Sequence, residues 1–333
     1  MYLAGFKRKA VLMNRILIVV GVLVLFASCK KDDNSDIVTI PPRSLSEVAL
    51  EDDADIKAFL QTHFYNYEDF DSPPAGFDYK IVLDTIEGVN SDKTPLIDMV
   101  DSSVISVSSD EFGLSEEETV NHTLYYLVAR EGAGVNPTVA DSTFVRYKGS
   151  LLNGTDFDGS FSTPIWFDLA ALQGPLQGAR GFSEAMPNFK TGGNVIDNGD
   201  GSFTVEEYGV GLMILPSGLG FFNTSQGGIE AYSPLVFSID LFTHNETDHD
   251  NDGVPSIQED VNGDGYLYND NTDEQAEEDA GLTLRFSDFL DQDDDQDGTL
   301  TRDEISDENG NIIIPYPDDN GDGIPNYLDP NVF

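Results

Sequence analysis

The stretch VRYKGSLLNGTDFDGSF, residues 145–161, places an aromatic residue and a carboxylate directly after a tight turn. Its pattern indicates a strand, a turn at Asn153-Gly154, and then Phe157 and Asp158 before a run of small residues. The surrounding chain has no GxSxG, HExxH or phosphate-loop motif, and the four histidines are scattered. Any binding or catalytic function of this stretch must therefore depend on Phe157 and Asp158 themselves.

Further aromatic side chains occur in the chain as far as residue 237 and could share a site with this pair. They are Tyr147, Trp166, Phe167, Phe182, Phe221, Phe222 and Phe237. Aromatic residues in such numbers most often form the core of a domain. A second interpretation, in which several of the rings line a pocket, stays open at this point.

A second group of chemically informative residues lies in the C-terminal part of the chain. The pattern D-x-[DN]-x-[DN]-G with an acid at position 12 is that of a calcium loop, because alternating oxygen ligands fold around one ion and Gly at position 6 permits the turn. The arrays that fit are Asp248, Asp250, Asp252, Gly253 and Glu259; Asp293, Asp295, Asp297, Gly298 and Glu304; and Asp318, Asn320, Asp322, Gly323 and Asp329. A degenerate array consists of Asp260, Asn262, Asp264 and Gly265, with Asn271 at position 12.

These arrays predict Ca²⁺ in a structural role, because without the ion the charge density would repel itself and leave the segment disordered. In a paired EF-hand, position 8 donates a backbone N–H to the partner loop, but Pro255 and Pro325 occupy it in two arrays and cannot donate. The sequences GVPS and GIPN resemble thrombospondin type 3-like repeats, whereas Leu300 keeps its loop closer to an EF-hand. The alternative is a plain acidic tail.

The charge of the chain excludes one large class of partner. There are 61 Asp and Glu against 17 Lys and Arg, a formal net charge of −44. Residues 244–333 alone contain 27 acidic residues against Arg285 and Arg302. Nucleic-acid binding needs clustered basic residues that displace counterions from phosphates, so we expect no nucleic-acid partner.

The N-terminus has the features of an export signal. Eleven apolar residues, 16–26, follow a basic region, and this run is too short to span a bilayer as a helix. Cys29, the only cysteine of the chain, ends the segment LFASC, which resembles the lipobox of bacterial lipoproteins. We therefore expect residues 1–28 to be a signal peptide and Cys29 to be acylated, which would anchor the protein in the cell envelope, with the outer membrane as the expected membrane. The alternative is an ordinary signal peptide in which Cys29 falls by chance.

Two segments separate the expected anchor from the aromatic stretch. Residues 29–44 have no periodicity and contain a Pro-Pro pair, which indicates a tether. Residues 45–119 are predicted to form an extension that is irregular, with a few short strands and one amphipathic helix. The apolar face of this helix is predicted from Ile56, Phe59, Leu60, His63 and Phe64. We expect His63 to pack in this face and not to catalyse.

Residues 120–243 have the pattern of an antiparallel sheet with a helix packed across it, an α+β arrangement. A helix is predicted at 179–189, short or kinked because Pro187 lacks an N–H. Residues 194–208 are interpreted as an inserted hairpin. Strands are predicted at 122–130, 142–152, 163–172, 202–215 and 233–242.

Taken in order, VRYKGSLLNGTDFDGS, PIWFDL, RGFSEAM, LPSGLGFF and SPLVFSIDLF resemble the FKBP-type peptidyl-prolyl isomerase domain. The most specific parts are the block from Tyr147-Lys148-Gly149 to Phe157-Asp158 and the closing PLVF. The resemblance implies an FKBP-like antiparallel sheet wrapped on one short helix, with an apolar pocket for a prolyl ring. It implies that the pocket residues are Tyr147, Phe157, Asp158, Ile165, Phe182, Phe221, Ile229 and Phe237.

Such a pocket would act by desolvation. Rotation about an amide costs about 18–20 kcal/mol because resonance is broken. The planar amide is more dipolar than the twisted one, so a dry pocket favours the twisted transition state without a cofactor. Asp158 would either accept a hydrogen bond near the substrate carbonyl or fix its own loop. Phe182 and Phe221 replace the Trp and Tyr that are usual in the family, so an N–H and a hydroxyl are missing.

The sequence therefore favours a lipid-anchored prolyl isomerase of the cell envelope that assists the folding of exported, proline-containing polypeptides. Residues 244–333 would form its calcium-binding segment. The alternative is a non-catalytic protein, stiffened by calcium, that binds proline-containing segments or contributes to adhesion. A pocket that binds such segments without turnover would separate the two.

Overall fold

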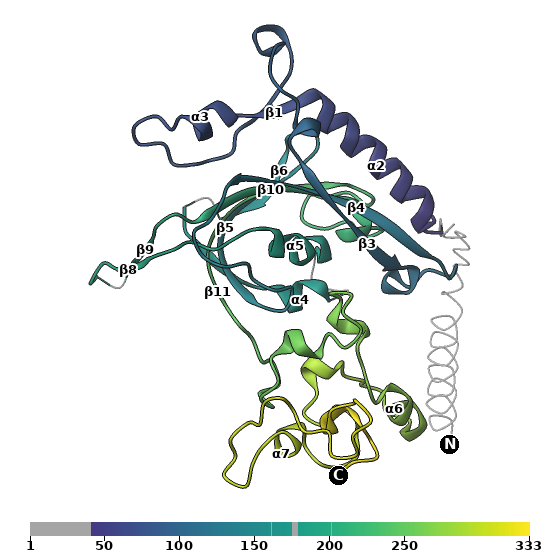
Figure 1. Ribbon diagram of the computed structural model, residues 1–333. Coiled ribbons are helices and arrows are strands. Elements are labelled where there is room, and N and C mark those ends of the chain that lie inside the picture. The colour runs from purple at the N-terminus through teal and green to yellow at the C-terminus, as the bar shows by residue number, and fades with distance from the viewer. Residues whose placement is uncertain (1–40, 161, 175–178, 201) are drawn as a thin grey trace, which may run out of the picture. The chain divides into compact units, whose positions relative to one another are not determined.

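The computed structural model describes residues 41–160, 162–174, 179–200 and 202–333 (Figure 1). The predicted signal peptide, Cys29 and most of the predicted tether lie outside the described residues. Among the residues that are described, no helix is both long and apolar enough to cross a membrane. Residues Pro42–Phe333 form one unit.

A seven-stranded sheet is the centre of this unit (Figure 1). Its neighbouring strands pair antiparallel in the order β3-β4-β10-β11-β5-β6, and β7 pairs with the N-terminal half of β5. The strands are β3 (Asp101–Ser108), β4 (Thr119–Arg130), β5 (Ser142–Leu151), β6 (Asp156–Gly159), β7 (Ile165–Asp168), β10 (Gly209–Leu215) and β11 (Leu235–Asn245). A sheet with helices packed on it confirms the predicted α+β class.

Two short helices, α4 (Leu169–Gln173) and α5 (Arg180–Ala185), pack on one face of the sheet, which curves around them (Figure 1). After α5 the chain makes a single 3-10 turn, Met186–Asn188, because Pro187 has no N–H for a longer helix. The predicted short helix is therefore confirmed. The main core lies between these helices and the sheet, and Phe182 is buried in it.

The opposite face of the sheet is covered by α2 (Leu45–Thr62) (Figure 1). Ser44 caps this helix by accepting a hydrogen bond from the N–H of Glu47 (3.3 Å). The buried apolar residues of α2 recur on one side of the helix and form a second core with Leu212 and Ile214 of β10. The central part of the sheet, around β4 and β10, is thus buried on both faces.

The helix ends before two of the residues that the sequence pattern assigns to it. His63 and Phe64 belong to β1 (His63–Tyr65), which pairs with β2 (Leu83–Thr85). The backbone is already extended at His63, with φ −120° and ψ 156°. The ring of His63 stacks on that of Phe59 at a centroid distance of 4.1 Å, so this side chain does pack as expected.

The N-terminal extension is more regular than predicted. It contributes β3 to the main sheet, with pairs from Asp101 opposite Tyr126 to Ser108 opposite Thr119. The serine-rich sequence DSSVISVS did not indicate this strand, because an edge strand that is largely exposed does not need continuous apolar character. The extension also contains α3 (Tyr67–Asp71).

Two predicted strands are divided differently in the structure. The stretch 163–172 is a strand only as far as Asp168, whose carboxylate caps α4. The stretch 202–215 is interrupted at Glu207 (φ 51°), which separates β9 (Phe203–Val205) from β10. The predicted inserted hairpin is confirmed, because β9 pairs with β8 (Val195–Asp197).

The acidic C-terminal segment follows β11. It contains α6 (Glu274–Ala280), α7 (Thr301–Glu304) and several single 3-10 turns. Its apolar side chains form small clusters, and in one of them Leu267 and Phe289 are buried together with Ala170 of α4. The segment therefore packs on the side of the sheet domain that carries the two short helices.

A buried carboxylate on α2 gives the fold a testable dependence on pH. Asp52 is 3% exposed and accepts hydrogen bonds from the backbone N–H (2.7 Å) and the hydroxyl (2.6 Å) of Ser217. Burial raises the pKa of Asp52 to about 6. The folded protein therefore retains this proton after the unfolded chain has lost it, so this group lowers stability as the pH rises from about 4 to 6.

We expect Asp52→Asn to remove this dependence while keeping an acceptor for Ser217. The free energy of unfolding of the variant relative to the unchanged protein should rise by about 2–3 kcal/mol between pH 4 and pH 7. Urea unfolding at a series of pH values measures this difference, in which the contributions of the other carboxylates cancel. A difference that does not vary with pH would contradict the assignment.

Candidate functional sites

A pocket opens on the side of the sheet that carries α4 and α5. It has a volume of about 180 Å³. The residues that line it are Tyr147, Phe157, Asp158, Phe167, Leu172, Ala179, Phe182, Phe221, Gln226 and Phe237. The structure thus brings together six of the eight residues implied by the family resemblance, namely Tyr147, Phe157, Asp158, Phe182, Phe221 and Phe237.

A tight turn connects β5 to β6, which pairs antiparallel with it. Gly154 has a φ of 80°, a left-handed conformation that favours glycine. The side chain of Asn153 accepts a hydrogen bond from the N–H of Thr155 (2.9 Å), and the N–H of Leu151 donates to the carbonyl of Thr155 (3.0 Å). The Asn-Gly pair therefore forms the turn that the sequence predicts.

A bulge in β6 places Phe157 and Asp158 in the same pocket. Gly149 lies opposite Asp158 and Ser150 lies opposite Asp156, so Phe157 is the extra residue of this strand. Consecutive residues of a regular strand face opposite sides of the sheet. Because the bulge interrupts this alternation, both the ring and the carboxylate line the pocket.

Gly149 provides the space that the ring of Phe157 occupies. A β-carbon on Gly149 would lie 2.6 Å from the ring of Phe157 and 3.0 Å from that of Phe237. Only a residue without a side chain permits such an approach of a ring to the backbone of β5. The glycine of the Tyr-Lys-Gly block is therefore required by the position of Phe157.

The phenylalanine rings of the pocket meet edge to face. The ring centroid of Phe182 lies 5.3 Å from the centroids of Phe167 and Phe237, and that of Phe157 lies 5.6 Å from Phe237. This arrangement is favoured by the charge distribution of aromatic rings. Phe182 is 2% exposed and lines the pocket.

The carboxylate of Asp158 is held in place at the pocket. The hydroxyl of Tyr147 donates to Asp158 Oδ2 (2.5 Å), and the N–H of Gly159 donates to Oδ1 (2.8 Å). Burial and the hydrogen bond to this carboxylate both raise the pKa of Tyr147, so its hydroxyl stays protonated. A carboxylate offers about four acceptor positions. Asp158, which is exposed, can therefore accept a further hydrogen bond from a bound group.

Two residues implied by the resemblance do not line this pocket. Ile165 is 36% exposed at the start of β7, opposite Val145, and Phe167 is the residue of that strand that reaches the pocket. Ile229 is 5% exposed and belongs to the main core. It forms a tight turn with Gln226, and the side chain that this turn contributes to the pocket is Gln226.

Four lining residues were not predicted as site residues: Phe167, Leu172, Ala179 and Gln226. The alternation of β7 could have indicated Phe167, since it shares a face with Ile165. Leu172 could not be placed because the sequence assigned it to a strand. No sequence signal marks Ala179 or Gln226.

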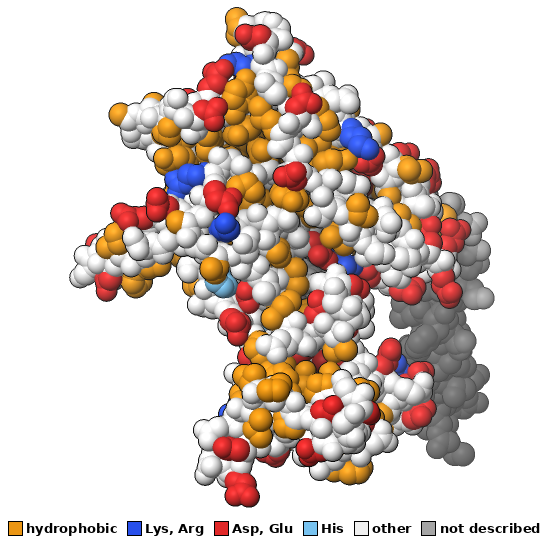
Figure 2. Space-filling view, in the orientation of Figure 1, with side chains coloured by type: hydrophobic (Ala, Val, Ile, Leu, Met, Phe, Trp, Pro, Cys, Tyr) orange, Lys and Arg blue, Asp and Glu red, His pale blue; other side chains and the backbone are white. Residues whose placement is uncertain are grey.

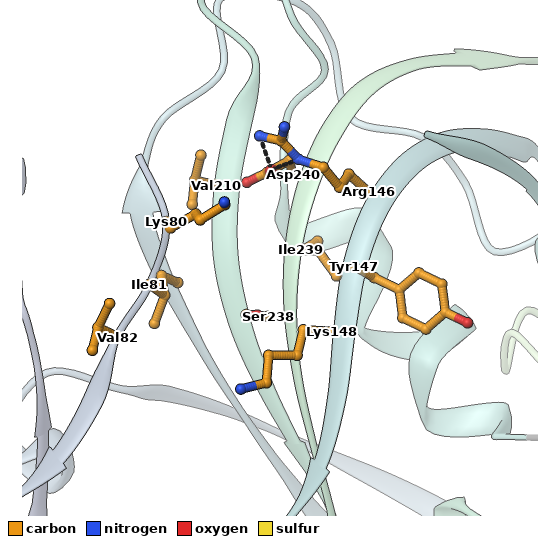
Figure 3. A pocket seen from close by; sticks show the side chains of 10 residues that line it. All are labelled: Lys80, Ile81, Val82, Arg146, Tyr147, Lys148, Val210, Ser238, Ile239 and Asp240. Carbon is orange, nitrogen blue, oxygen red and sulfur yellow. Dashed lines mark hydrogen bonds and ion pairs between the residues drawn. The ribbon is translucent and has the colours of Figure 1, made fainter. Parts of the chain in front are cut away.

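A second hollow, of about 250 Å³, lies on the opposite face of the sheet (Figure 3). It is bordered by Lys80, Ile81 and Val82 of the extension and by outward-facing residues of β5 and β11. Arg146 and Asp240 form an ion pair there, with Nε and Oδ2 2.6 Å apart, while the ring of Tyr147 points away (Figure 3). Lys80 and Lys148 also line this hollow, and they pair with Asp78 (3.2 Å) and Asp156 (2.9 Å). Because each charged side chain of the hollow already has a partner of opposite charge, the hollow offers less to a polar ligand than the aromatic pocket.

The acidic segment gathers buried carboxylates into clusters. In the first cluster, oxygens of Asp250, Asp252, Glu259 and Asp294 all lie within 4.8 Å of one another. Glu259 is fully buried and Asp294 is 1% exposed. None of the four oxygens of these two residues has a hydrogen-bond partner within the described structure. The array at 248–259 predicts three members of the cluster, whereas Asp294 lies within the array at 293–304, at a position that the pattern does not assign to a ligand, and was not predicted.

Burial and repulsion between neighbouring carboxylates raise the pKa of both Glu259 and Asp294 to about 10. In the described part of the chain, no ion pair with Lys or Arg reaches any of the four carboxylates. Buried charges without a partner cost several kcal/mol each. A divalent cation would remove this cost, and carboxylate oxygens are the ligands that Ca²⁺ prefers. The residues of the first cluster therefore fit a bound Ca²⁺.

Two other arrays also form clusters. Their members are Asp260, Asp264 and Asp270, and Asp293, Asp295 and Asp297. Glu304, at position 12 of the later array, has no hydrogen-bond partner for either oxygen among the residues that the structure describes. Asp248 has one buried oxygen without a partner, and its other oxygen accepts from Gly253. Asn262 instead donates to the side chain of Asn269 (3.2 Å).

The last array does not form such a cluster in the described structure. Asn320 donates to the carboxylates of Asp329 (2.6 Å) and Asp322 (3.2 Å). Asp318 accepts hydrogen bonds from the N–H groups of Gly321 and Gly323. The oxygens that a cation would need are thus engaged with donors of the same loop.

The acidic segment contacts the helices that form part of the pocket. The N–H of Leu267 donates to Oε1 of Gln173 (2.9 Å), a buried residue whose Nε2 donates to the carbonyl of Val139 (3.2 Å). The guanidinium of Arg180, the first residue of α5, lies 4.1 Å from the ring centroid of Tyr266. The loop that contains Asp260, Asp264 and Asp270, which we call the second carboxylate cluster, therefore contacts both α4 and α5.

Comparison with known proteins relates different parts of the chain to different families. The family described as BamM C-terminal matches residues 249–317, within the acidic segment. The FKBP-type peptidyl-prolyl cis-trans isomerase FkpA of Escherichia coli K12 is 28% identical over 126 residues, which are 37% of this chain and 38% of that protein. Peptidyl-prolyl cis-trans isomerase Mip of Coxiella burnetii is 35% identical over 77 residues, 22% of this chain and 31% of that protein.

The crystal structure of FkpA from Escherichia coli matches 37% of this chain and 48% of that chain, at 27% identity and a TM-score of 0.29. The chain spans about a third of the length of the curated relatives that it matches. About a third of this chain is therefore similar in sequence to FKBP-type peptidyl-prolyl isomerases.

The close approach at Gly149 gives a test of the pocket geometry. Gly149→Ala should lower the free energy of unfolding by about 1–3 kcal/mol, because the new methyl group overlaps the ring of Phe157. In a Phe157→Ala background the same substitution should cost clearly less, because that ring is gone. Urea unfolding of the four proteins measures the coupling, and an equal cost in both backgrounds would contradict the described position of Phe157.

Proposed function

We propose that the sheet domain is a peptidyl-prolyl cis-trans isomerase that acts on X–Pro bonds of exported polypeptides. The observation that carries this proposal is the pocket, an apolar cavity with a carboxylate held beside it by Tyr147. Its lining includes Phe157, Phe182 and Phe237, at positions that the FKBP resemblance implies. The sequence similarity to FkpA and Mip supports the same class of reaction.

The pocket would accelerate isomerisation by changing the solvation of the amide. Unaided X–Pro bonds isomerise in tens to hundreds of seconds. A prolyl ring placed among Phe157, Phe182 and Phe237 would remove water from the adjoining amide. The planar amide loses more solvation than the less dipolar twisted form, so the barrier between them falls. No nucleophile or cofactor takes part in this step.

Polar groups beside the pocket would orient the peptide. Asp158, fixed by Tyr147 and Gly159, would accept a hydrogen bond from a peptide N–H. The amide of Gln226 lines the same pocket and can donate to a peptide carbonyl. Because Phe221 has no hydroxyl for that purpose, we expect weak to moderate turnover.

The alternative function is binding of proline-containing segments without turnover, as in a client-binding or adhesion protein. The purely apolar side chains of Phe182 and Phe221 favour it, since they preserve the pocket but offer no hydrogen bond to a substrate. The two functions predict the same affinity for a peptide and differ only in its rate of isomerisation.

We also propose a location in the cell envelope. Its support is the sequence of the leader, in which a basic region and an apolar run precede the lipobox-like segment at Cys29. Acylation of Cys29 would anchor the protein to a membrane, with the outer membrane as the expected one. The domain would then meet exported polypeptides as they fold.

For the acidic segment we propose Ca²⁺ in a structural role. The support is the set of buried carboxylate oxygens without partners, above all those of Glu259 and Asp294. Ca²⁺ would neutralise these charges and keep the loops folded. Through Tyr266 and Leu267 the loaded segment would also support α4 and α5.

The isomerase proposal predicts that the purified protein accelerates cis-trans isomerisation of a short X–Pro peptide. Phe157→Ala should reduce kcat/KM at least about tenfold, because water enters the pocket. The matched control is Val195→Ala, an exposed substitution in the β8–β9 hairpin, which should leave kcat/KM unchanged. Absence of acceleration by the folded, calcium-loaded protein would favour binding without turnover.

The calcium proposal predicts that a chelator lowers the thermal midpoint of the protein and that Ca²⁺ restores it, since a ligand at a hundredfold its Kd stabilises by about 2.7 kcal/mol. Glu259→Gln should remove one bound Ca²⁺ in calorimetric titration. Glu308→Gln, an exposed acid of the same segment, is the control and should bind as the unchanged protein does. Equal stoichiometry for Glu259→Gln would contradict the first site.

A further inference from the structure

A further group of carboxylates lies outside every calcium-loop pattern of the sequence. Oxygens of Asp273, Glu277 and Asp291 all lie within 4.8 Å of one another. Asp273 immediately precedes α6, and Glu277 lies four residues later, on the same side of the helix. Asp291 comes from the chain just after the loop that follows α6. The sequence gives no signal for this group because its members are spaced by four and fourteen residues.

The burial of this group sets it apart from an ordinary acidic surface. Asp273 is 5% exposed and Glu277 is 2% exposed. Asp273 Oδ2 is buried and has no hydrogen-bond partner among the described residues, although it faces the oxygens of Glu277 and Asp291. Asp273 occupies the N-cap position of α6 but makes no capping hydrogen bond. Its carboxylate is therefore directed to the cluster instead of to the helix end.

No basic side chain compensates these charges in the part of the chain that the structure describes. Arg285, the nearest basic residue in sequence, pairs with Glu278 on α6, at a distance of 3.9 Å. A second polar atom at the site, Asn271 Oδ1, is buried and also lacks a partner, while Asn271 Nδ2 donates to Glu277 (2.9 Å). Carboxylates that face one another at this burial repel strongly unless a cation lies between them.

We propose that Asp273, Glu277 and Asp291 form a further divalent-cation site, which takes Ca²⁺ or an ion of similar preference for oxygen ligands. Three carboxylates supply the charge, and the amide oxygen of Asn271 supplies a neutral ligand of the kind that Ca²⁺ accepts. None of the three carboxylates belongs to one of the calcium-loop arrays, whereas Asn271 stands at position 12 of the degenerate array and would connect that loop to this site.

The position of the site indicates what the cation does. Near the end of the excursion 274–290, Asp288 is already joined to the chain before the excursion, because it accepts hydrogen bonds from the N–H (2.7 Å) and hydroxyl (2.8 Å) of Thr272. The N–H of Asp288 also donates to the carbonyl of Asp270 (2.9 Å). A cation on Asp273, Glu277 and Asp291 would form a second closure of the same excursion and fix α6 at its base.

The test counts metal ions. Native mass spectrometry of the purified protein with Ca²⁺ compares the unchanged chain with the double variant Asp273→Asn/Glu277→Gln. The control, Glu274→Gln/Glu278→Gln, removes two exposed acids of the same helix and so the same charge. We expect the first variant to bind one Ca²⁺ fewer than the other two proteins. Equal counts in all three proteins, or no bound Ca²⁺ in the unchanged protein, would overturn the proposal.

A second measurement reports on the excursion itself and does not depend on the calcium loops. Arg285 is the only Lys or Arg between residues 191 and 301, so trypsin cleavage there reports on this excursion alone. Ca²⁺ should slow the cleavage in the unchanged protein and in Glu259→Gln, but not in Asp273→Asn/Glu277→Gln. Protection by Ca²⁺ that persists in the double variant would contradict the site, whereas loss of a Ca²⁺ only in Glu259→Gln would support the calcium loops alone.

Discussion

Strand β10 is apolar on both faces, and the surrounding elements are arranged to cover it. Met213 and Leu215 lie in the core shared with α5, while Leu212 and Ile214 lie in the core shared with α2. A central strand with large apolar residues on alternate sides needs a layer on each face of its sheet. The N-terminal extension supplies the outer layer and is therefore an integral part of the fold. The inner layer, α4 and α5, leaves the space that becomes the aromatic pocket.

The carboxylate of the pocket is exposed and hydrogen-bonded, whereas those of the acidic segment are buried together. In the pocket, Asp158 is exposed, held by Tyr147, and set beside rings that exclude water. In the acidic segment, Glu259 and Asp294 are buried and have no hydrogen-bond partner among the described residues, so their charged forms are costly unless a cation neutralises them. The two regions meet at α4 and α5, where the loop of the second carboxylate cluster contacts the helices that contribute Leu172 and Phe182 to the pocket. The loop that contains Asp260, Asp264 and Asp270 is therefore linked to the aromatic pocket through these two helices.

Much of the pocket could be predicted because its determinants are local: the Asn153-Gly154 turn, the glycine at 149 and the aromatic residue that follows them in β6. Ile165 and Ile229 do not line the described cavity, because the register of β7 and the short turn at Gln226 decide which side chain reaches it. Strand β3 was not predicted, because an edge strand can be polar and its sequence then lacks an apolar pattern. Asp294 could not be assigned to the first cluster either, since only the tertiary fold brings one array against another. Local spacing thus predicted loops and turns, while contacts between distant segments required the structure.

The proposed isomerase requires that a prolyl ring binds among the rings beside Asp158 and that its X–Pro bond isomerises there. The most direct test is NMR of the isotope-labelled protein during titration with a short X–Pro peptide, with exchange spectroscopy on the peptide itself. We expect the largest chemical-shift changes at Phe157, Phe182 and Phe237, and we expect the protein to accelerate cis-trans exchange of the peptide. Changes centred instead on Lys80 and Asp240, at the hollow on the opposite face of the sheet, would contradict it, as would a peptide whose exchange rate does not change.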